Sequence, residues 1–230
     1  MKLMVFNTQH CLNFVEKRID FEIMAETIKR FDPDIVGLNE MRGKGASPDY
    51  EDQTAALQAL TGYPYAFFAK ALDVGGVNPY GNAMLSKLPI LNAQIIPIPT
   101  PQVEGRVEPR CILKACLEGG ITLLVTHFGL TPEERENAVR TVLSVKAEEK
   151  CILMGDFNTP PDSAVLRPIR ACMKDTADAF EGEKLSFRSD EPHVKIDYIF
   201  VTPDIEVISA DIPAVIASDH RPHIACVSVG

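Results

Sequence analysis

The sequence feature that most constrains the fold is the stretch from Cys151 to Asn158, where an apolar run ends in closely spaced polar groups. The four apolar residues at 151–154 indicate a short buried strand. Gly155 then allows the backbone to turn, and Asp156 and Asn158 follow two positions apart. If the backbone stays extended, both side chains point to the same side of it. Such a pair can hold Mg²⁺, a phosphate oxygen or a water, although the same residue types are also typical of turns.

Short apolar runs of this kind recur along the chain, so we expect strands to dominate the structure. Composition and partial alternation predict strands at residues 2–8, 34–39, 65–70, 90–98, 111–117, 121–126, 151–155, 196–201, 205–212 and 224–229. Glu118-Gly119-Gly120 joins two of these runs as a β-hairpin. A hairpin pairs its strands antiparallel, which argues against a purely parallel sheet.

Four segments predict helices. Residues 21–31 carry apolar side chains at helical spacing, and residues 53–60 and 164–173 indicate two further helices. Thr131-Pro132-Glu133-Glu134 forms a capping-box pattern with a proline in the first turn, so we expect a helix from there to about residue 149. These elements predict an α+β fold, a four-layer α/β/β/α sandwich. Two mostly antiparallel sheets pack face to face with the helices outside, and residues 1–230 form a single domain.

Composition narrows the class of protein. The 230 residues are 46% hydrophobic, enough for a core, and the formal net charge of −9 with no basic run disfavours binding to nucleic acid phosphates. No apolar run approaches the roughly 20 residues of a membrane span, and the N-terminus lacks the features of a signal peptide. The six cysteines include no Cys-x-x-Cys pair. We expect Cys111, Cys116, Cys151 and Cys226 to be reduced core residues of a cytoplasmic protein.

Polar residues stand at the ends of many of the expected strands. They are Asn7, Glu40, Asn82, His127, Asp156, Asn158, Asp197, Asp219 and His220. Because a sandwich gathers its strand-end loops at two ends, several of these side chains can share one cleft despite their separation in sequence. The set is rich in oxygen groups and contains no cysteine, so it suits Mg²⁺ or Mn²⁺ better than zinc.

Together these segments resemble the endonuclease/exonuclease/phosphatase family, which includes deoxyribonucleases, apurinic endonucleases and neutral sphingomyelinases. The resemblance runs from Asn7 to His220 in the family's order. Gly155-Asp156-Phe157-Asn158 and Ser218-Asp219-His220 are specific when found together. Leu38-Asn39-Glu40 is similar to the family's Gln-Glu strand end, with Asn in place of Gln, and residues 80–86 and 196–199 match two further blocks.

The resemblance implies a role for each matching residue. It makes Glu40 the principal Mg²⁺ ligand, with Mn²⁺ as a substitute ion, places Asn7 close to it, and has Asp219 hold or orient the ion. It also makes Asp197 the partner of His220, which would fix the imidazole tautomer and favour its charged form.

The same resemblance implies the chemistry, in-line attack of water on phosphorus. The Asp197–His220 dyad would activate that water or stabilise the phosphoryl group, and Asp156 competes as the general base. Asn158 would hydrogen-bond a non-bridging phosphate oxygen. His127 would be a second imidazole on the phosphate and a candidate acid for the leaving oxygen.

Three residues are weaker candidates for substrate binding. Tyr80 fits plain packing as well as substrate contact, and Asn82 could be structural beside Gly81. Arg110 could reach a phosphate or form an ordinary surface ion pair.

We therefore expect a cytoplasmic Mg²⁺-dependent phosphoesterase that hydrolyses a small or medium organic phosphate ester, a phosphodiester more readily than a monoester. A nuclease acting on DNA or RNA is the alternative, which a positive rim around the cleft would favour. No hydrophobic hairpin or amphipathic helix suggests a membrane lipid. A catalytically inactive binding module of the same fold ranks lowest, because the residues expected to bind metal and to act as base are all present.

Overall fold

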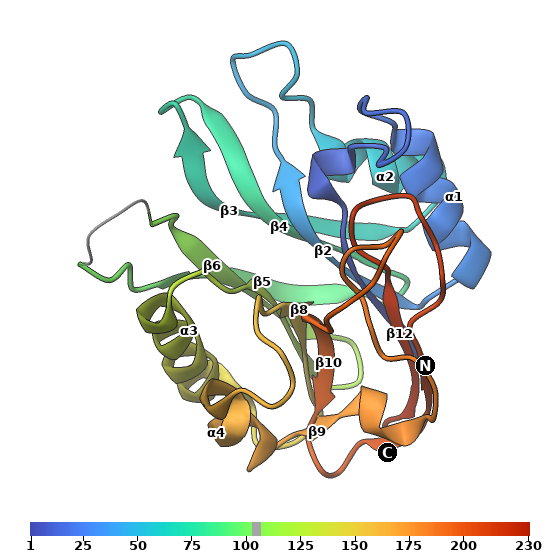
Figure 1. Ribbon diagram of the computed structural model, residues 1–230, viewed down its shortest axis with the longest axis vertical. Helices are drawn as coiled ribbons and strands as arrows, with labels where there is room; N and C mark the ends of the chain where they lie inside the picture. The colour runs from blue at the N-terminus through green and yellow to red at the C-terminus, as the bar shows by residue number, and fades with distance from the viewer. Residues whose placement is uncertain (103–106) are drawn as a thin grey trace.

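Strands account for most of the regular structure in residues 1–102 and 107–230, which the computed structural model describes (Figure 1). The strands are β1 (Lys2–Asn7), β2 (Ile35–Arg42), β3 (Tyr65–Val74), β4 (Asn78–Ser86), β5 (Ile90–Ile98), β6 (Arg110–Leu117), β7 (Ile121–His127), β8 (Cys151–Asp156), β9 (Lys174–Asp175), β10 (Asp197–Val201), β11 (Glu206–Asp211) and β12 (His223–Ser228). The helices are α1 (Phe21–Phe31), α2 (Gln53–Thr61), α3 (Pro132–Val145) and α4 (Arg167–Arg170), with short 3₁₀ segments η1 (Gln9–Cys11), η2 (Ala164–Leu166) and η3 (Thr176–Ala179).

The strands form two six-stranded sheets, with the orders β11-β12-β1-β2-β4-β3 and β5-β6-β7-β8-β10-β9. Two central pairs are parallel, β1 with β2 and β7 with β8. The other pairs among the described residues are antiparallel, including the expected β6–β7 hairpin. The prediction of two mostly antiparallel sheets is therefore confirmed.

Alternation along the strands sorts side chains into three apolar layers. In β1, Leu3 and Val5 pack between the two sheets, whereas Met4 and Phe6 face α1 and α2. In β8, Ile152 and Met154 face the first sheet, and Cys151 and Leu153 face the side covered by α3. Figure 1 shows the result, with α1 and α2 outside one sheet and α3 and α4 outside the other. This is the expected four-layer α/β/β/α sandwich.

Two glycines let backbone segments approach closely at the centre of the sandwich. A Cβ on Gly37 of β2 would lie 2.6 Å from Met154 Sδ in the facing sheet, so Met154 would have to shift to make room for a side chain there. A Cβ on Gly155 would lie 1.8 Å from the carbonyl oxygen of Thr126. We expected from the sequence that Gly155 turns the chain, and this expectation is wrong. Gly155 lies inside β8 and permits close pairing with β7, and the turn follows Asp156.

The helix that begins at Thr131 confirms its expected N-terminus. The Thr131 side chain accepts a hydrogen bond from the Glu134 amide, and Glu134 completes the capping box. The helix ends at Val145 instead of near residue 149, because its apolar face ends there and polar residues follow. The helix expected over residues 164–173 is also shorter. Pro168 cannot continue a helix that starts at 164, so η2 gives way to α4 with Pro168 in its first turn.

Two other expectations about strands need correction. β2 does not end at residue 39 but continues to Arg42 through a register shift, and Glu40 lies within it at a φ of 62°. Cys116 is exposed, because it shares the outward face of β6 with Lys114. Cys226 is half-buried, while Cys111 and Cys151 are core residues as expected, and all six cysteines are free.

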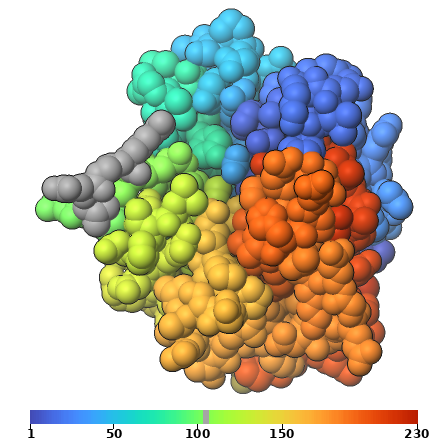
Figure 2. All heavy atoms as spheres, viewed as in Figure 1, coloured from blue at the N-terminus to red at the C-terminus, as the bar shows by residue number. Residues whose placement is uncertain are grey.

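Segments from distant parts of the chain meet on one face of the molecule. Figure 2 shows N-terminal, central and C-terminal surfaces in contact near the middle of this face. Among the described residues, no helix combines the length and apolarity needed to cross a bilayer.

Candidate active site

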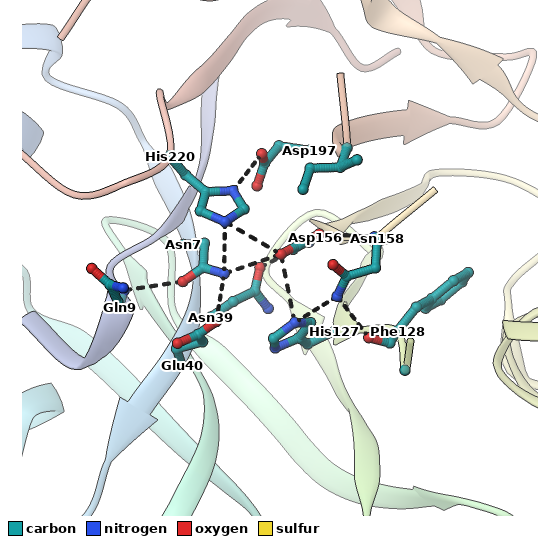
Figure 3. Close-up of polar contacts among 12 residues, drawn as sticks. Asn7, Gln9, Asn39, Glu40, His127, Phe128, Asp156, Asn158, Asp197 and His220 are labelled. Carbon is teal, nitrogen blue, oxygen red and sulfur yellow. Dashed lines mark hydrogen bonds and ion pairs between the residues drawn. The ribbon is translucent and has the colours of Figure 1, made fainter. Parts of the chain in front are cut away.

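Sheet topology brings the polar strand ends together at one edge of the sandwich. Because β1 and β2 run parallel, Asn7 at the end of β1 lies beside Asn39. The parallel pair β7 and β8 likewise places His127 beside Asp156, and antiparallel pairing places the first residue of β10, Asp197, opposite Asp156. These ends face one another across the two sheets (Figure 3).

Asn39 connects the two sheets beneath the site. Its side-chain nitrogen donates to the backbone oxygen of Thr126 at 2.9 Å and to Asn82 Oδ1 at 2.8 Å, and its oxygen accepts from the Asp156 amide at 2.9 Å. It is fully buried. We did not single out Asn39 as a site residue from the sequence. The available signal was the Asn-for-Gln difference in Leu38-Asn39-Glu40, a polar residue in an otherwise apolar strand.

Asn7 links the catalytic candidates of the two sheets. Its Nδ2 lies 3.0 Å from Glu40 Oε1 and 3.1 Å from Asp156 Oδ2, and 3.5 Å from His220 Nε2. Its oxygen accepts a hydrogen bond from the Gln9 amide at 3.0 Å. Asn7 thus turns its donor toward two carboxylates and holds them on a common side of the site.

His220 lies between two carboxylates. Its Nδ1 is 2.8 Å from Asp197 Oδ2, and its Nε2 is 3.7 Å from Asp156 Oδ2. Burial alone would lower the pKa of His220, but Asp197 and Asp156 outweigh that effect and raise it to about 10. Burial raises the pKa of Asp156 to about 7, even though His220 opposes the shift. Burial also raises the pKa of Glu40.

His127 has a different environment. Its Nδ1 lies 2.9 Å from Arg110 Nη1, and its Nε2 lies 3.5 Å from Asp156 Oδ2 and 3.1 Å from Asn158 Nδ2. Burial, then Arg110 and His220, lower the pKa of His127 well below its usual value. Asn158 is held by a bond from its amide to Asp156 Oδ1 and by one from Nδ2 to the Phe128 oxygen.

The remaining candidates lie at different distances from this cluster. Asp219 is half-buried beside it, where its charge acts on both His220 and Glu40. Tyr80 is half-buried, and burial and the Glu40 carboxylate raise its hydroxyl pKa. Asn82 is 2% exposed, and both ends of its amide bond to protein, to Asn39 and to the Cys111 oxygen. Arg110 contacts His127 and pairs with Glu108 at 2.9 Å.

The register of the hairpin could have revealed the Arg110–His127 contact from sequence. Leu117 pairs with Ile121 and Ile112 with Thr126. Extending that register places Arg110 beside the residues that follow Thr126. Counting outward from the turn at Glu118-Gly119-Gly120 therefore identifies Arg110 as a neighbour of His127.

The residues of the cluster fit a hard divalent cation. Asp156, Asp197 and His220 each offer one ligand atom within 4.8 Å of the others. Asp197 Oδ1 is buried with no hydrogen-bond partner among the described residues, and Glu40 adds another carboxylate nearby. Oxygen donors in excess over cationic side chains are what Mg²⁺ and Mn²⁺ require.

A buried imidazole between carboxylates, at the join of two sheets, is an arrangement suited to proton transfer and to binding an anion. The chain belongs to the endonuclease/exonuclease/phosphatase family, whose sequence model matches residues 4–220. Members of this family are metal-dependent hydrolases that act on phosphoester bonds. The resemblance inferred from the sequence is thus confirmed.

Solved structures share the fold at low sequence identity. An endonuclease/exonuclease/phosphatase from Beutenbergia cavernae has a TM-score of 0.84 at 23% identity, covering 100% of this chain and 72% of that one. A protein of the same description from Bacteroides vulgatus has a TM-score of 0.80 at 22% identity, covering 100% and 98%. A mannosyl-6-phosphatase from Bacteroides thetaiotaomicron has a TM-score of 0.77 at 14% identity, covering 99% of both chains. No curated protein sequence matches the chain.

Proposed function

We propose that the chain is a phosphoesterase that uses Mg²⁺, or Mn²⁺ in its place, to hydrolyse a small or medium organic phosphate ester, a phosphodiester more readily than a monoester. Residues 1–230 would act as one catalytic domain. The observation that carries the proposal is the buried group of Asp156, Asp197 and His220, in which two carboxylates lie 3.7 and 2.8 Å from one imidazole. Family membership supports the reaction class.

The shifted pKa values support a division of roles between His220 and Asp156. With a pKa raised to about 10, His220 is an imidazolium at neutral pH and can stabilise a phosphoryl oxygen, but it has no free pair to accept a proton. Asp156, with a pKa raised to about 7, is matched to remove a proton from water near neutral pH. We therefore favour Asp156 as the general base, with Asp197 holding His220 in its charged form.

Glu40, Asn7 and Asp219 are the residues proposed to hold or orient the metal ion. Asn7 fixes the Glu40 carboxylate through its 3.0 Å bond, and burial penalises the charge of Glu40 until a cation is near. The bound ion would polarise a phosphoryl oxygen and offset the negative charge that develops in the transition state. Asn158 and His127 would bind the non-bridging oxygens on the other side of the phosphorus.

The charges around the site favour a small substrate. Among the described arginines near the site, four are paired with a carboxylate: Arg42 with Asp49, Arg110 with Glu108, Arg188 with Asp190 and Arg221 with Glu183. Arg135, whose charge reaches Asp156, donates to the Gly129 oxygen instead. Paired arginines form no positive rim for a nucleic acid backbone. A nuclease therefore remains the second candidate, and an inactive binding module the third.

A substrate panel on pure protein tests the proposal. It contains bis-p-nitrophenyl phosphate, p-nitrophenyl phosphate, sugar phosphates, inositol phosphates, phosphatidylcholine analogues, supercoiled plasmid and single-stranded RNA, each with Mg²⁺, with Mn²⁺ and with EDTA. We expect metal-dependent cleavage of the diester, slower cleavage of monoesters and intact plasmid.

Two variants serve as controls for the panel. The double variant Asp156→Ala, His220→Ala excludes contaminating enzymes, and Asp211→Asn changes an exposed carboxylate on the edge strand β11. Nicked plasmid or degraded RNA would favour the nuclease. Silence on every ester, together with no calorimetric Mg²⁺ or Mn²⁺ binding, would leave the binding module.

A further inference from the structure

The contact between Arg110 and His127 determines which imidazole nitrogen carries a proton. Arg110 Nη1 lies 2.9 Å from His127 Nδ1, inside hydrogen-bond distance. A guanidinium nitrogen is always a donor, so Nδ1 must accept and therefore carries no proton. A neutral imidazole has one ring proton, which must then lie on Nε2.

Burial and an ion pair hold the Arg110 side chain in this contact. Its side chain is 11% exposed, and the same Nη1 lies 2.9 Å from Glu108 Oε1. His127 is itself 4% exposed, at the end of the neighbouring strand of the hairpin. Arg110 is thus held between a carboxylate and an imidazole, and its charge opposes any second proton on the ring.

One contact on the other side of the ring competes with this assignment. Asn158 Nδ2 lies 3.1 Å from His127 Nε2, and donation there would require Nε2 to be unprotonated. Asn158 Nδ2 carries two protons, and one of them goes to the Phe128 oxygen at 3.0 Å, so only the other could reach the ring. The hydrogen bond from a guanidinium is charge-assisted and about twice as strong as one from a neutral amide, so Arg110 decides the tautomer.

We propose that Arg110 is a positioning residue that holds His127 in the Nε2–H tautomer, so that His127 acts as a neutral hydrogen-bond donor to a phosphate oxygen and not as the acid for the leaving group. The Nε2 atom faces the site, since Asp156 Oδ2 lies 3.5 Å away. Because Nδ1 accepts from Arg110, the ring carries a single proton, on Nε2. His127 donates that proton in a hydrogen bond and does not transfer it to the leaving group. The donor role rests on the proposed phosphoesterase function, whereas the tautomer does not.

Nuclear magnetic resonance of the protein labelled with ¹⁵N-histidine measures the tautomer directly. The chain has five histidines, and His127→Gln identifies the signals of His127. We expect an unprotonated Nδ1 and a protonated Nε2 from pH 6 to 8 in the wild type, with or without Mg²⁺. A proton on Nδ1, alone or with one on Nε2, would overturn the proposal whether or not any substrate is cleaved.

Variants of Arg110 test whether it sets the tautomer. Arg110→Met removes the donor at similar length, and we expect a mixture of tautomers. Arg110→Lys keeps a cationic donor and should restore the wild-type signals. Arg42→Gln is the matched control, because Arg42 is 16% exposed and paired with Asp49, and among the described residues it forms no hydrogen bond to His127. Unchanged His127 signals in Arg110→Met would refute the role of Arg110.

Leaving-group dependence separates the donor role from the acid role. For His127→Ala, a lost acid slows esters of poor leaving groups far more than p-nitrophenyl esters, because the proton goes to the leaving oxygen. A lost donor to a non-bridging oxygen slows all esters alike. We expect kcat losses of about 100-fold that stay within roughly threefold across a series of aryl phosphodiesters. For Arg110→Met we expect a uniform loss of about tenfold, and losses that grow with leaving-group pKa would overturn the proposal.

Discussion

Two largely buried polar clusters adjoin β10 and arrange similar side chains in different ways. In the first, the candidate active-site cluster, Asp156 and Asp197 share one imidazole, His220. In the second, which we call the structural cluster (Arg170, Asp175, Lys195 and His223), one carboxylate is shared by two cations. Asp175 Oδ2 lies 2.8 Å from Lys195 Nζ and 2.9 Å from Arg170 Nη2.

The two clusters shift carboxylate pKa values in opposite directions. Burial alone would raise the pKa of Asp175, but Lys195 and its other partners lower it. Asp156 is as deeply buried and has its pKa raised to about 7, because burial, with help from the Asp197 charge, outweighs the opposing charge of His220. The direction of the shift therefore distinguishes a closed ion pair from a site that gains free energy by binding a cation.

The largest expected effect is on catalysis in the first cluster. Asp156→Asn removes the proposed base while preserving size, so we expect kcat to fall on the order of 10³-fold. The free energy of unfolding in EDTA should not fall by more than about 1 kcal/mol, because the substitution removes a buried charge. Steady-state kinetics and urea unfolding measure the two effects. A large loss of stability with a small loss of kcat would make Asp156 a structural residue.

The structural cluster should respond in the opposite way. Lys195→Met leaves Asp175 with Arg170 alone and should cost about 3 kcal/mol of unfolding free energy, with kcat reduced less than about fivefold. Lys146→Met is the matched control, since Lys146 is 8% exposed but its partner Glu148 is 90% exposed, and it should cost less than about 1 kcal/mol. Equal losses in the two variants would show that burial of the pair contributes nothing.

The pH dependence of stability sharpens the contrast further. The folded pKa of His220, about 10, exceeds its unfolded value of 6.5, so the folded state holds the extra proton between these values. The stabilisation is complete below pH 6.5 and is lost as the pH rises through about 10. In EDTA, we expect unfolding free energy to fall between pH 7.5 and 9.5 on the order of 2 kcal/mol more in wild type than in His220→Gln. Parallel curves for the two proteins would contradict the shift.

The smallest effect concerns the connection between the clusters. Tyr198 donates from its hydroxyl to the Thr159 oxygen at 2.7 Å, and its ring lies 3.5 Å from Lys195 Nζ. Tyr198→Phe should cost about 1 kcal/mol of stability and raise KM slightly, because Thr159 follows Asn158. Tyr65→Phe, on an exposed tyrosine, is the control. A kcat loss above tenfold would mean that the structural cluster takes part in positioning the site.

Local patterns predicted most of the fold. The helix at 21–31 and the capping box at Thr131 were recognisable because helical spacing and caps involve neighbours in sequence. The end of the short helix after 164 was missed although Pro168 marked it. The extension of β2 through Glu40 could not be seen locally, since the register shift depends on pairing with β4.

The candidate site divides in the same way. Residues with a motif around them, such as Asp156 and His220, were identified from the sequence and lie together in the structure. Asn39 was missed because its role depends on hydrogen bonds to Thr126 and Asn82, which belong to other strands. The partner of His127 was missed because it depends on strand register, a relation between two segments.

The close approach of Gly37 to Met154 has a consequence for catalysis. Asn7 and Glu40 belong to one sheet, and Asp156 and Asp197 to the other. The thickness of the hydrophobic layer between the sheets therefore acts as a spacer that sets the gap between the two halves of the site. A side chain added at Gly37 would press on Met154 and Val125 of the facing sheet, so that layer would have to repack without any change to the site residues themselves. Positions deep in the apolar interior therefore help to set the distance between the two halves of the candidate site.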